Sequence, residues 1–127
     1  MMTAKIVIPQ TQIVPNDKVL LLQMLDAARE ALSFCEGYTR SALDTNRILL
    51  LALIEEIEII GGTAERVSEI IKFQLPQSPW PAIVDMRNHL LHSYFDIDVD
   101  QVWSTVQQDL PPLITELQKV VFDDRAE

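Results

Sequence analysis

An unbroken apolar run, Ile48-Leu49-Leu50-Leu51-Ala52-Leu53-Ile54, limits the folds open to this chain more than any other feature. It lies inside a longer segment with helical periodicity, and a helix that is apolar on every side cannot lie on the rim of a monomeric bundle. The run is far shorter than the ~20 residues that a membrane-spanning helix requires. We therefore expect a soluble, cytoplasmic protein in which a second copy of the chain covers one face of this helix.

The composition favours a single helical domain. The chain has 127 residues, of which 48% are hydrophobic, and this is enough for one continuous core. Only three glycines occur, and few segments alternate between apolar and polar residues, so helices are favoured over a sheet. The single cysteine, Cys35, falls on an apolar stripe and is expected to be buried. We expect no secretion signal, because the first residues lack a charged segment that leads into an apolar core with a small-residue cleavage site.

The spacing of apolar residues predicts an all-α, up-and-down bundle of four main helices. The first starts at a cap, Asn16 or Asp17, and is stopped by Gly37. The third starts at the cap Ser78, and the last at Asp98 or Asp100, with a kink at Pro111-Pro112. The predicted helices span residues 16–36, 41–73, 78–93 and 98–120.

The ends of the chain are predicted to lie outside this helical domain, which spans residues 16–122. Residues 1–15 form an extended arm, because Pro9 and Pro15 prevent a helix. Two readings of the arm stay open: a strand packed on the bundle or on a neighbour, and a loosely held tail. Residues 123–127 are expected to be a solvated tail.

The segment from Arg87 to Tyr94 holds both histidines and therefore most of the chain's ionisable chemistry near neutral pH. On a helix, Asn88 and His92 are four residues apart and share a face, and the long Arg87 side chain can bend over the helix end. An arginine presents a fork of donors to a phosphate, and a histidine exchanges a proton near pH 7. These residues predict a phosphate-directed site with Tyr94 at its edge.

Metal-independent RNA cleavage is the reaction that this set of side chains suits. Histidine can take the 2′-hydroxyl proton or protonate the leaving oxygen, while arginine stabilises the negative charge that builds on the phosphate. Two copies facing each other across a dimer would supply a base, an acid and two guanidinium groups. The net charge of −9 excludes binding of nucleic acid through the overall field, so RNA must meet a local site, a basic partner or a surface assembled between subunits.

A purely structural reading of the same residues stays open. Arg87 could do no more than pair with Asp85 or a glutamate, and His92 could simply end its helix. His89, His92 and Asp85 lack a fourth ligand at metal-site spacing, and no glycine-rich phosphate loop is present, so we expect neither a metal nor a cofactor. The adjacent glycines at 61 and 62 either break the second helix or let another backbone approach closely.

A longer motif adds a family resemblance. Arg87 is followed after four residues by His92 and after one more by Tyr94, and the pieces that surround this pattern are Pro79-Trp80, Phe95-Asp96-Ile97-Asp98, Val102-Trp103 and Asp109-Leu110-Pro111. This stretch, residues 79–111, resembles the HepT branch of the HEPN superfamily, the toxin half of the HepT/MntA toxin–antitoxin systems. The order of helices agrees over about residues 17–120.

The resemblance implies a dimeric all-α bundle with Arg87 and His92 as the ribonuclease pair and Asn88 as the polar residue beside the arginine. It also implies that a partner nucleotidyltransferase, MntA, attaches AMP to Tyr94 and so silences the toxin. The added bulk and negative charge would compete with the RNA phosphate. The alternative, from another class, is a non-catalytic helical module that binds a nucleotidyltransferase or presents it with substrate.

One position departs from the family pattern Ile-Gly-Glu-Ala. Residues 60–64 read Ile-Gly-Gly-Thr-Ala, so Gly62 replaces the glutamate. If the second and third helices run antiparallel from a junction near residues 75–80, a rise of about 1.5 Å per residue brings His92 level with residues 59–62. The missing carboxylate would lie near the site. Its absence either makes the local field less negative, which would help RNA approach, or weakens the enzyme.

Overall fold

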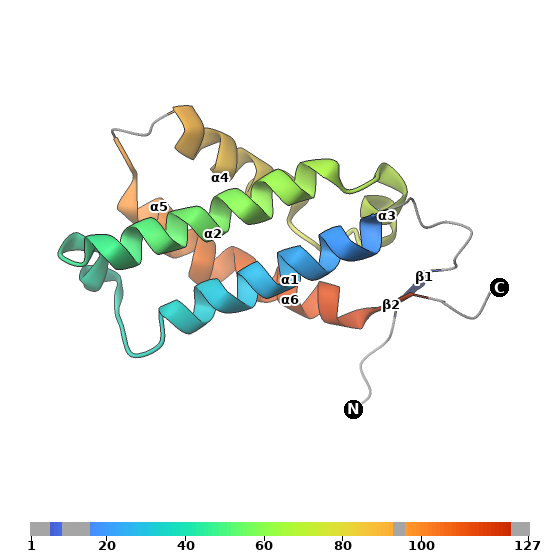
Figure 1. The fold of residues 1–127 in the computed structure, drawn as a ribbon, viewed down its shortest axis with the longest axis horizontal. Coiled ribbons are helices and arrows are strands. Elements are labelled where there is room, and N and C mark those ends of the chain that lie inside the picture. Colours follow the sequence, from blue (N-terminus) through green and yellow to red (C-terminus); the bar gives the residue numbers. More distant parts are fainter. Residues whose placement is uncertain (1–5, 9–15, 93–95, 123–127) are drawn as a thin grey trace.

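The computed structural model describes residues 6–8, 16–92 and 96–122, and over these residues it confirms the predicted all-α bundle (Figure 1). Four helical rods form the bundle: α1, α2, α4 and the continuous run α5–η3–α6. The elements are β1 (Ile6–Ile8), α1 (Asp17–Phe34), η2 (Arg40–Asp44), α2 (Arg47–Arg66), α3 (Glu69–Gln74), α4 (Trp80–His92), α5 (Val99–Ser104), η3 (Thr105–Asp109), α6 (Leu110–Lys119) and β2 (Val120–Phe122).

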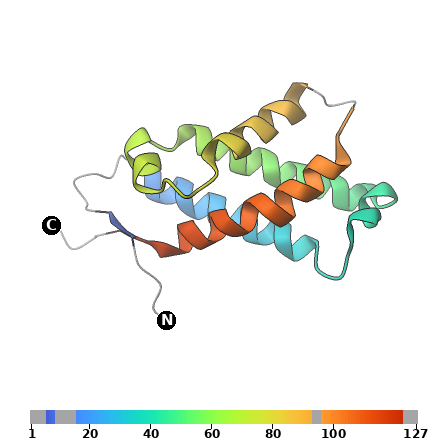
Figure 2. The ribbon, with the colours of Figure 1, turned by 180° about the vertical axis from the view of Figure 1, so that it is seen from behind.

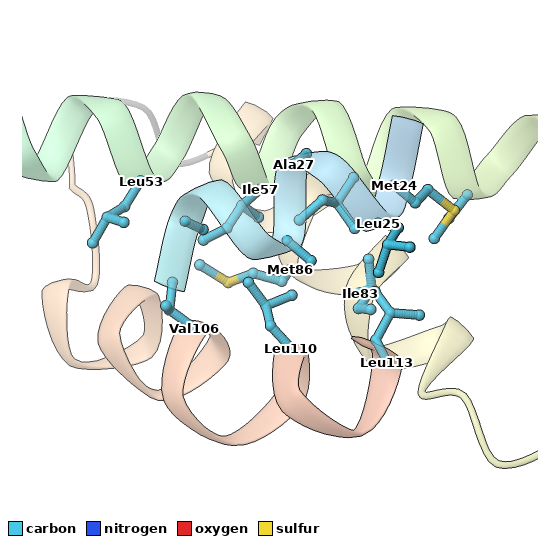
Figure 3. Close-up of a cluster of buried hydrophobic side chains, with 14 of the residues drawn as sticks. Met24, Leu25, Ala27, Leu53, Ile57, Ile83, Met86, Val106, Leu110 and Leu113 are labelled. Carbon is cyan, nitrogen blue, oxygen red and sulfur yellow. The ribbon is translucent and has the colours of Figure 1, made fainter. Parts of the chain in front are cut away.

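Helix α2 packs against α1 on one side and against α4 on another, while α6 packs on α1 (Figures 1 and 2). Side chains from all four rods meet in one core (Figure 3). Met24, Leu53, Ile57, Ile83 and Leu110 are each at most 1% exposed. Because burial of such a side chain contributes about 1.5–3 kcal/mol, this core fixes the approach of α4 to α2.

Helix α1 begins where the sequence predicts and ends slightly early. Asn16 is its N-cap residue, but the side chain makes no capping hydrogen bond. The helix ends at Phe34 rather than Glu36, and Gly37 follows with φ +80°, a left-handed conformation that favours glycine. Cys35 is buried as predicted, and burial raises the pKa of its thiol.

The predicted extent of the second helix is wrong, because the structure divides residues 40–74 into η2, α2 and α3. The break after Arg66 is imposed from another part of the chain. The backbone N–H and the hydroxyl of Ser68 donate to the Asp17 carboxylate at 3.1 and 2.7 Å. Ser68 Oγ in turn accepts from the N–H of Ile71 at 3.4 Å as the N-cap of α3.

The loop before α4 is held by Trp80 rather than by the predicted cap. Ser78 was expected to cap this helix, but its hydroxyl is buried and has no partner within the described residues. The indole N–H of Trp80 donates to the carbonyl of Leu75 at 3.0 Å. This bond ties the first turn of α4 to the end of α3.

The last rod starts at the predicted cap. Asp98 accepts from the N–H of Gln101 at 3.0 Å. Pro111 and Pro112 lie in the first turn of α6, directly after the π-helical turn η3. Because neither proline has an N–H, the carbonyls of residues 107 and 108 lose their usual donors, and a wider turn accommodates this loss. At the predicted kink, the structure therefore has a π turn.

The extended N-terminal segment forms a strand over residues 6–8. It pairs in parallel with β2, Val7 opposite Val121. The end of the fourth rod, predicted as helix up to Val120, supplies this partner strand. The rest of the predicted arm and tail, residues 1–5, 9–15 and 123–127, lies outside the described residues.

The apolar run of α2 is only partly covered by the bundle. Its buried members are Leu49, Leu50, Leu53 and Ile54. Ile48 is 83% exposed and Leu51 40% exposed, so the single chain leaves one face of α2 uncovered, as expected. Among the helices of the described residues, none has the length and apolar character needed to cross a membrane.

Candidate active site on α4

Arg87 lies where α4 meets α2, and its aliphatic stem rests on the backbone of Gly61. A Cβ atom at Gly61 would lie 2.3 Å from Cβ and 2.7 Å from Cγ of Arg87, and 3.2 Å from the carbonyl oxygen of Ile83. No side chain fits in that space unless the helices move apart. Of the two predicted roles of the glycine pair, close approach is confirmed and a helix break is wrong, because α2 continues to Arg66.

The guanidinium of Arg87 is held along one edge. Its Nη1 donates to Oε1 of Glu65 at 2.6 Å and lies 3.5 Å from Oδ1 of Asn88. Its Nε is buried and has no partner among the described residues. Nη2 lies 4.0 Å from the position that a Cβ of Gly62 would occupy. One nitrogen is therefore engaged by a carboxylate, and another lies over a residue without a side chain.

The predicted register of the two helices is wrong. Arg87, not His92, lies against Gly61, and His92 follows five residues later, about 7.5 Å along the axis of α4. The reason is that α2 ends at Arg66 rather than near Phe73, so the connection between the helices starts earlier than the periodicity indicates.

Two further predicted site residues have different outcomes. Asn88 is half-buried beside Arg87, as its place next to the arginine suggests. Tyr94 lies outside the described residues, so its place at the edge of the site stays a prediction.

His89 lies on a different side of α4 from Arg87, because two residues turn a helix by about 200°. It lines a hollow of ≈ 360 Å³ with Asp85, Asp98 and Asp109, and burial raises the pKa of Asp109. Within residues 6–8, 16–92 and 96–122, no group of three or more ligand side chains could hold a metal ion. The structure thus places the two neighbours Arg87 and His89 on separate faces.

A buried carboxylate lies elsewhere, between α1 and α2. Glu56 is 4% exposed, and its Oε2 has no hydrogen-bond partner in the described part of the chain. It lines a hollow of ≈ 260 Å³ with Asp26 and Glu30. Burial is the main cause that raises the pKa of Glu56 from 4.5 to about 8, and a hydrogen bond with Glu30 and the charges of Glu30 and Glu55 add to it. The raised pKa favours the neutral form of Glu56 at pH values below about 8.

Glu56→Gln is expected to reduce the dependence of stability on pH. The folded protein binds a proton that the unfolded chain releases, so stability falls as the pH rises from 4.5 to about 8. Glutamine imitates the neutral acid and cannot lose a proton. Between the two pH values, the free energy of unfolding should therefore fall by at least about 1.4 kcal/mol less in the variant than in the wild type, the equivalent of one pKa unit. Urea unfolding at about pH 6 and pH 9 measures the difference, with the exposed Glu36→Gln as the control. A variant that loses as much stability as the wild type between these pH values would contradict this assignment.

Glu65 is the contact residue that the sequence reasoning did not identify. It lies three residues after Gly62, on a neighbouring position of the α2 surface. This spacing is the only feature of the sequence that points to Glu65, because nothing else indicates which of the many glutamates contacts Arg87. A purely structural role of Arg87 would be an ion pair with Asp85 or a glutamate. Such an ion pair is present, and its partner is Glu65.

Known proteins resemble the chain over most of its length. The family model described as "Ribonuclease HepT-like" matches residues 24–120. A "Probable ribonuclease HepT" of Thermococcus cleftensis is 31% identical over 100 residues, which cover 76% of this chain and 91% of the relative. "Putative RNase MJ1380" of Methanocaldococcus jannaschii is 29% identical over 103 residues, 81% of this chain and 94% of the relative. No solved structure matches the chain significantly.

Proposed function

Because this chain belongs to the ribonuclease HepT-like family of the HEPN superfamily, we propose that it is a metal-independent endoribonuclease that cuts RNA with Arg87 and His92. The observation that carries the proposal is the placement of Arg87. Its stem is fixed on Gly61, its side chain is partly exposed, and it belongs to the helix that ends at His92. Asn88, beside the arginine, is its supporting residue.

In the proposed reaction, the 2′-hydroxyl of a ribose attacks the adjacent phosphorus, and the bond from phosphorus to the 5′ oxygen breaks. The products are a 2′,3′-cyclic phosphate and a free 5′-hydroxyl. His92 takes the 2′-hydroxyl proton or gives a proton to the leaving 5′ oxygen. Arg87 donates hydrogen bonds to the phosphate oxygens, on which negative charge builds in the transition state.

We propose that the enzyme works as a homodimer formed through the exposed face of α2. Ile48 and Ile59 are eleven residues apart, about 20° around the helix, and are 83% and 39% exposed. Gly62 lies about 40° around the helix from Ile48 and about 60° from Ile59, so this face continues to the open side of the Arg87 guanidinium. A second copy here would cover the apolar residues and supply a second histidine, so that one acts as base and the other as acid.

The test of the proposed function is RNA cleavage by the purified protein in the presence of a chelator. We expect cut RNA with 2′,3′-cyclic phosphate ends, and a solution mass near twice that of one chain. Intact RNA together with tight binding of a nucleotidyltransferase would favour the non-catalytic helical module instead. Cleavage that stops with the chelator and returns with added metal would contradict the metal-independent mechanism.

We further propose that the protein is the toxin of a toxin–antitoxin pair and that an MntA-like nucleotidyltransferase inactivates it by adding AMP to Tyr94. Support comes from the sequence, in which Tyr94 follows His92 by two residues. An AMP group on this tyrosine would bring a negative phosphate close to the end of α4. It would then compete with the RNA phosphate for Arg87.

Tyr94→Phe is expected to give a protein that the nucleotidyltransferase cannot silence. Phenylalanine keeps the ring and removes the hydroxyl that would form the bond to AMP. Intact mass after co-expression should increase by one or more AMP units for the wild type and not for the variant. Tyr38→Phe, an exposed tyrosine on another loop, is the control and should still be modified. An unchanged adduct on Tyr94→Phe would place the modification elsewhere.

A further inference from the structure

Glu65 makes the shortest polar contact of the candidate site, at 2.6 Å from Nη1 of Arg87. The two side chains are 44% and 29% exposed, and an ion pair at this exposure contributes only about 0–1 kcal/mol to stability. The contact therefore contributes little to the stability of the fold. Its larger consequence is the orientation of the guanidinium.

The orientation of Arg87 is determined at three points. Its stem lies against the backbone of Gly61, its Nε is turned into the protein, and its Nη1 is held by Glu65. An arginine side chain otherwise loses about 2 kcal/mol of rotamer entropy when it is fixed. Because these contacts fix it before substrate arrives, a phosphate would meet a guanidinium that is already oriented.

The contacts also determine which nitrogen of the Arg87 guanidinium stays free to bind a phosphate. The carboxylate of Glu65 takes Nη1, whereas Nη2 lies over Gly62 at 4.0 Å from the site of a Cβ, and no partner for Nη2 is found in the described residues. A glutamate at position 62 would instead bring its carboxylate towards Nη2. The position that loses its carboxylate at Gly62 does lie beside the arginine, but Glu65 supplies another carboxylate there, on a different nitrogen.

We infer that Glu65 is a positioning residue of the ribonuclease site, which holds Arg87 by Nη1 so that Nη2 donates to the RNA phosphate. This inference rests on the proposed function. Glu65 does not touch substrate in this arrangement; it acts through the arginine. Removal of its charge should therefore reduce the rate of the bound complex more than the affinity for RNA.

The experiment compares Glu65→Gln, Glu65→Asp and the control Glu69→Gln, an exposed glutamate that pairs with Lys72. We expect Glu65→Gln to lower kcat by about tenfold, less than the 10²-fold that a 1 Å misplacement can cost, because the stem of Arg87 stays on Gly61; KM should change by less than about twofold. Glu65→Asp keeps the charge and should recover part of kcat, and Glu69→Gln should match the wild type. Cleavage by Glu65→Gln at or above the wild-type rate would overturn the inference, because Glu65 would then compete with the phosphate.

A second measurement does not depend on catalysis. The Nε–H and Nη–H signals of Arg87 in the NMR spectrum, assigned with Arg87→Lys, should show slow guanidinium rotation in the wild type and fast rotation in Glu65→Gln. Equal signals in both proteins would mean that Glu65 does not hold the arginine in solution. A wild type that cuts no RNA but shows this difference would contradict the ribonuclease function and leave the Glu65 contact in place, so the two failures are distinguishable.

Discussion

His92→Ala should lower the rate of RNA cleavage by about 10²–10⁴-fold, the usual contribution of a general acid or base. The expected loss is large because, in the proposed reaction, the histidine transfers a proton at the step that breaks the phosphorus–oxygen bond. Substrate affinity should change far less, because the proposed phosphate contact of Arg87 is kept in this variant. Rates are measured under single-turnover conditions with a short RNA, over about pH 5–9, and the loss should appear in the rate constant at saturating enzyme.

The matched control is His89→Ala. His89 belongs to the same helix, three residues earlier, but lines the hollow towards α5 with Asp85 and Asp98. His89→Ala and His92→Ala replace the same residue type at nearly the same place, so any general damage to α4 should appear in both variants. Loss of activity in His89→Ala equal to that in His92→Ala, or full activity in His92→Ala, would contradict the assignment.

The parts of the fold that depend on local sequence could be predicted. Apolar residues repeat with helical spacing in α1, and the carboxylate of Asp98 caps the last rod through an N–H three residues away. Both features need only neighbouring residues. The break after α2 could not be predicted, because it depends on Asp17, which lies 51 residues from Ser68 in the chain. The strand at Val120 likewise needs β1, at the opposite end of the chain.

The candidate site also has local features, which could be predicted, and features that depend on helix packing, which could not. The spacing of Arg87 and His92 on one helix is a local property, and α4 contains both as predicted. The environment of Arg87 is a property of two helices. Which glutamate it meets and which glycine it rests on follow from the register of α4 against α2, and this register depends on where α2 ends.

The glycine pair shows most clearly the difference between properties that follow from local sequence and properties that depend on how two helices pack. Helix propensity alone makes Gly61 and Gly62 equivalent: each lies inside a helix, where alanine is favoured by about 1 kcal/mol. The structure makes them different. A Cβ at Gly61 would overlap the stem of Arg87, whereas the nearest atom to a Cβ at Gly62 is Nη2 at 4.0 Å, an ordinary contact.

Gly61→Ala should therefore destabilise the protein by about 1–3 kcal/mol, the usual cost of adding a methyl group to a filled interior, in spite of its better helix propensity. Gly62→Ala should stabilise it by up to about 1 kcal/mol. Thermal unfolding of the two variants measures the difference. Gly61→Ala should also reduce RNA cleavage, because α4 must move away from α2 and carries Arg87 with it. If both alanines shift stability in the same direction and by the same amount, the close approach of α4 to α2 at Gly61 is wrong, and with it the fixed orientation of Arg87 on which the proposed site depends.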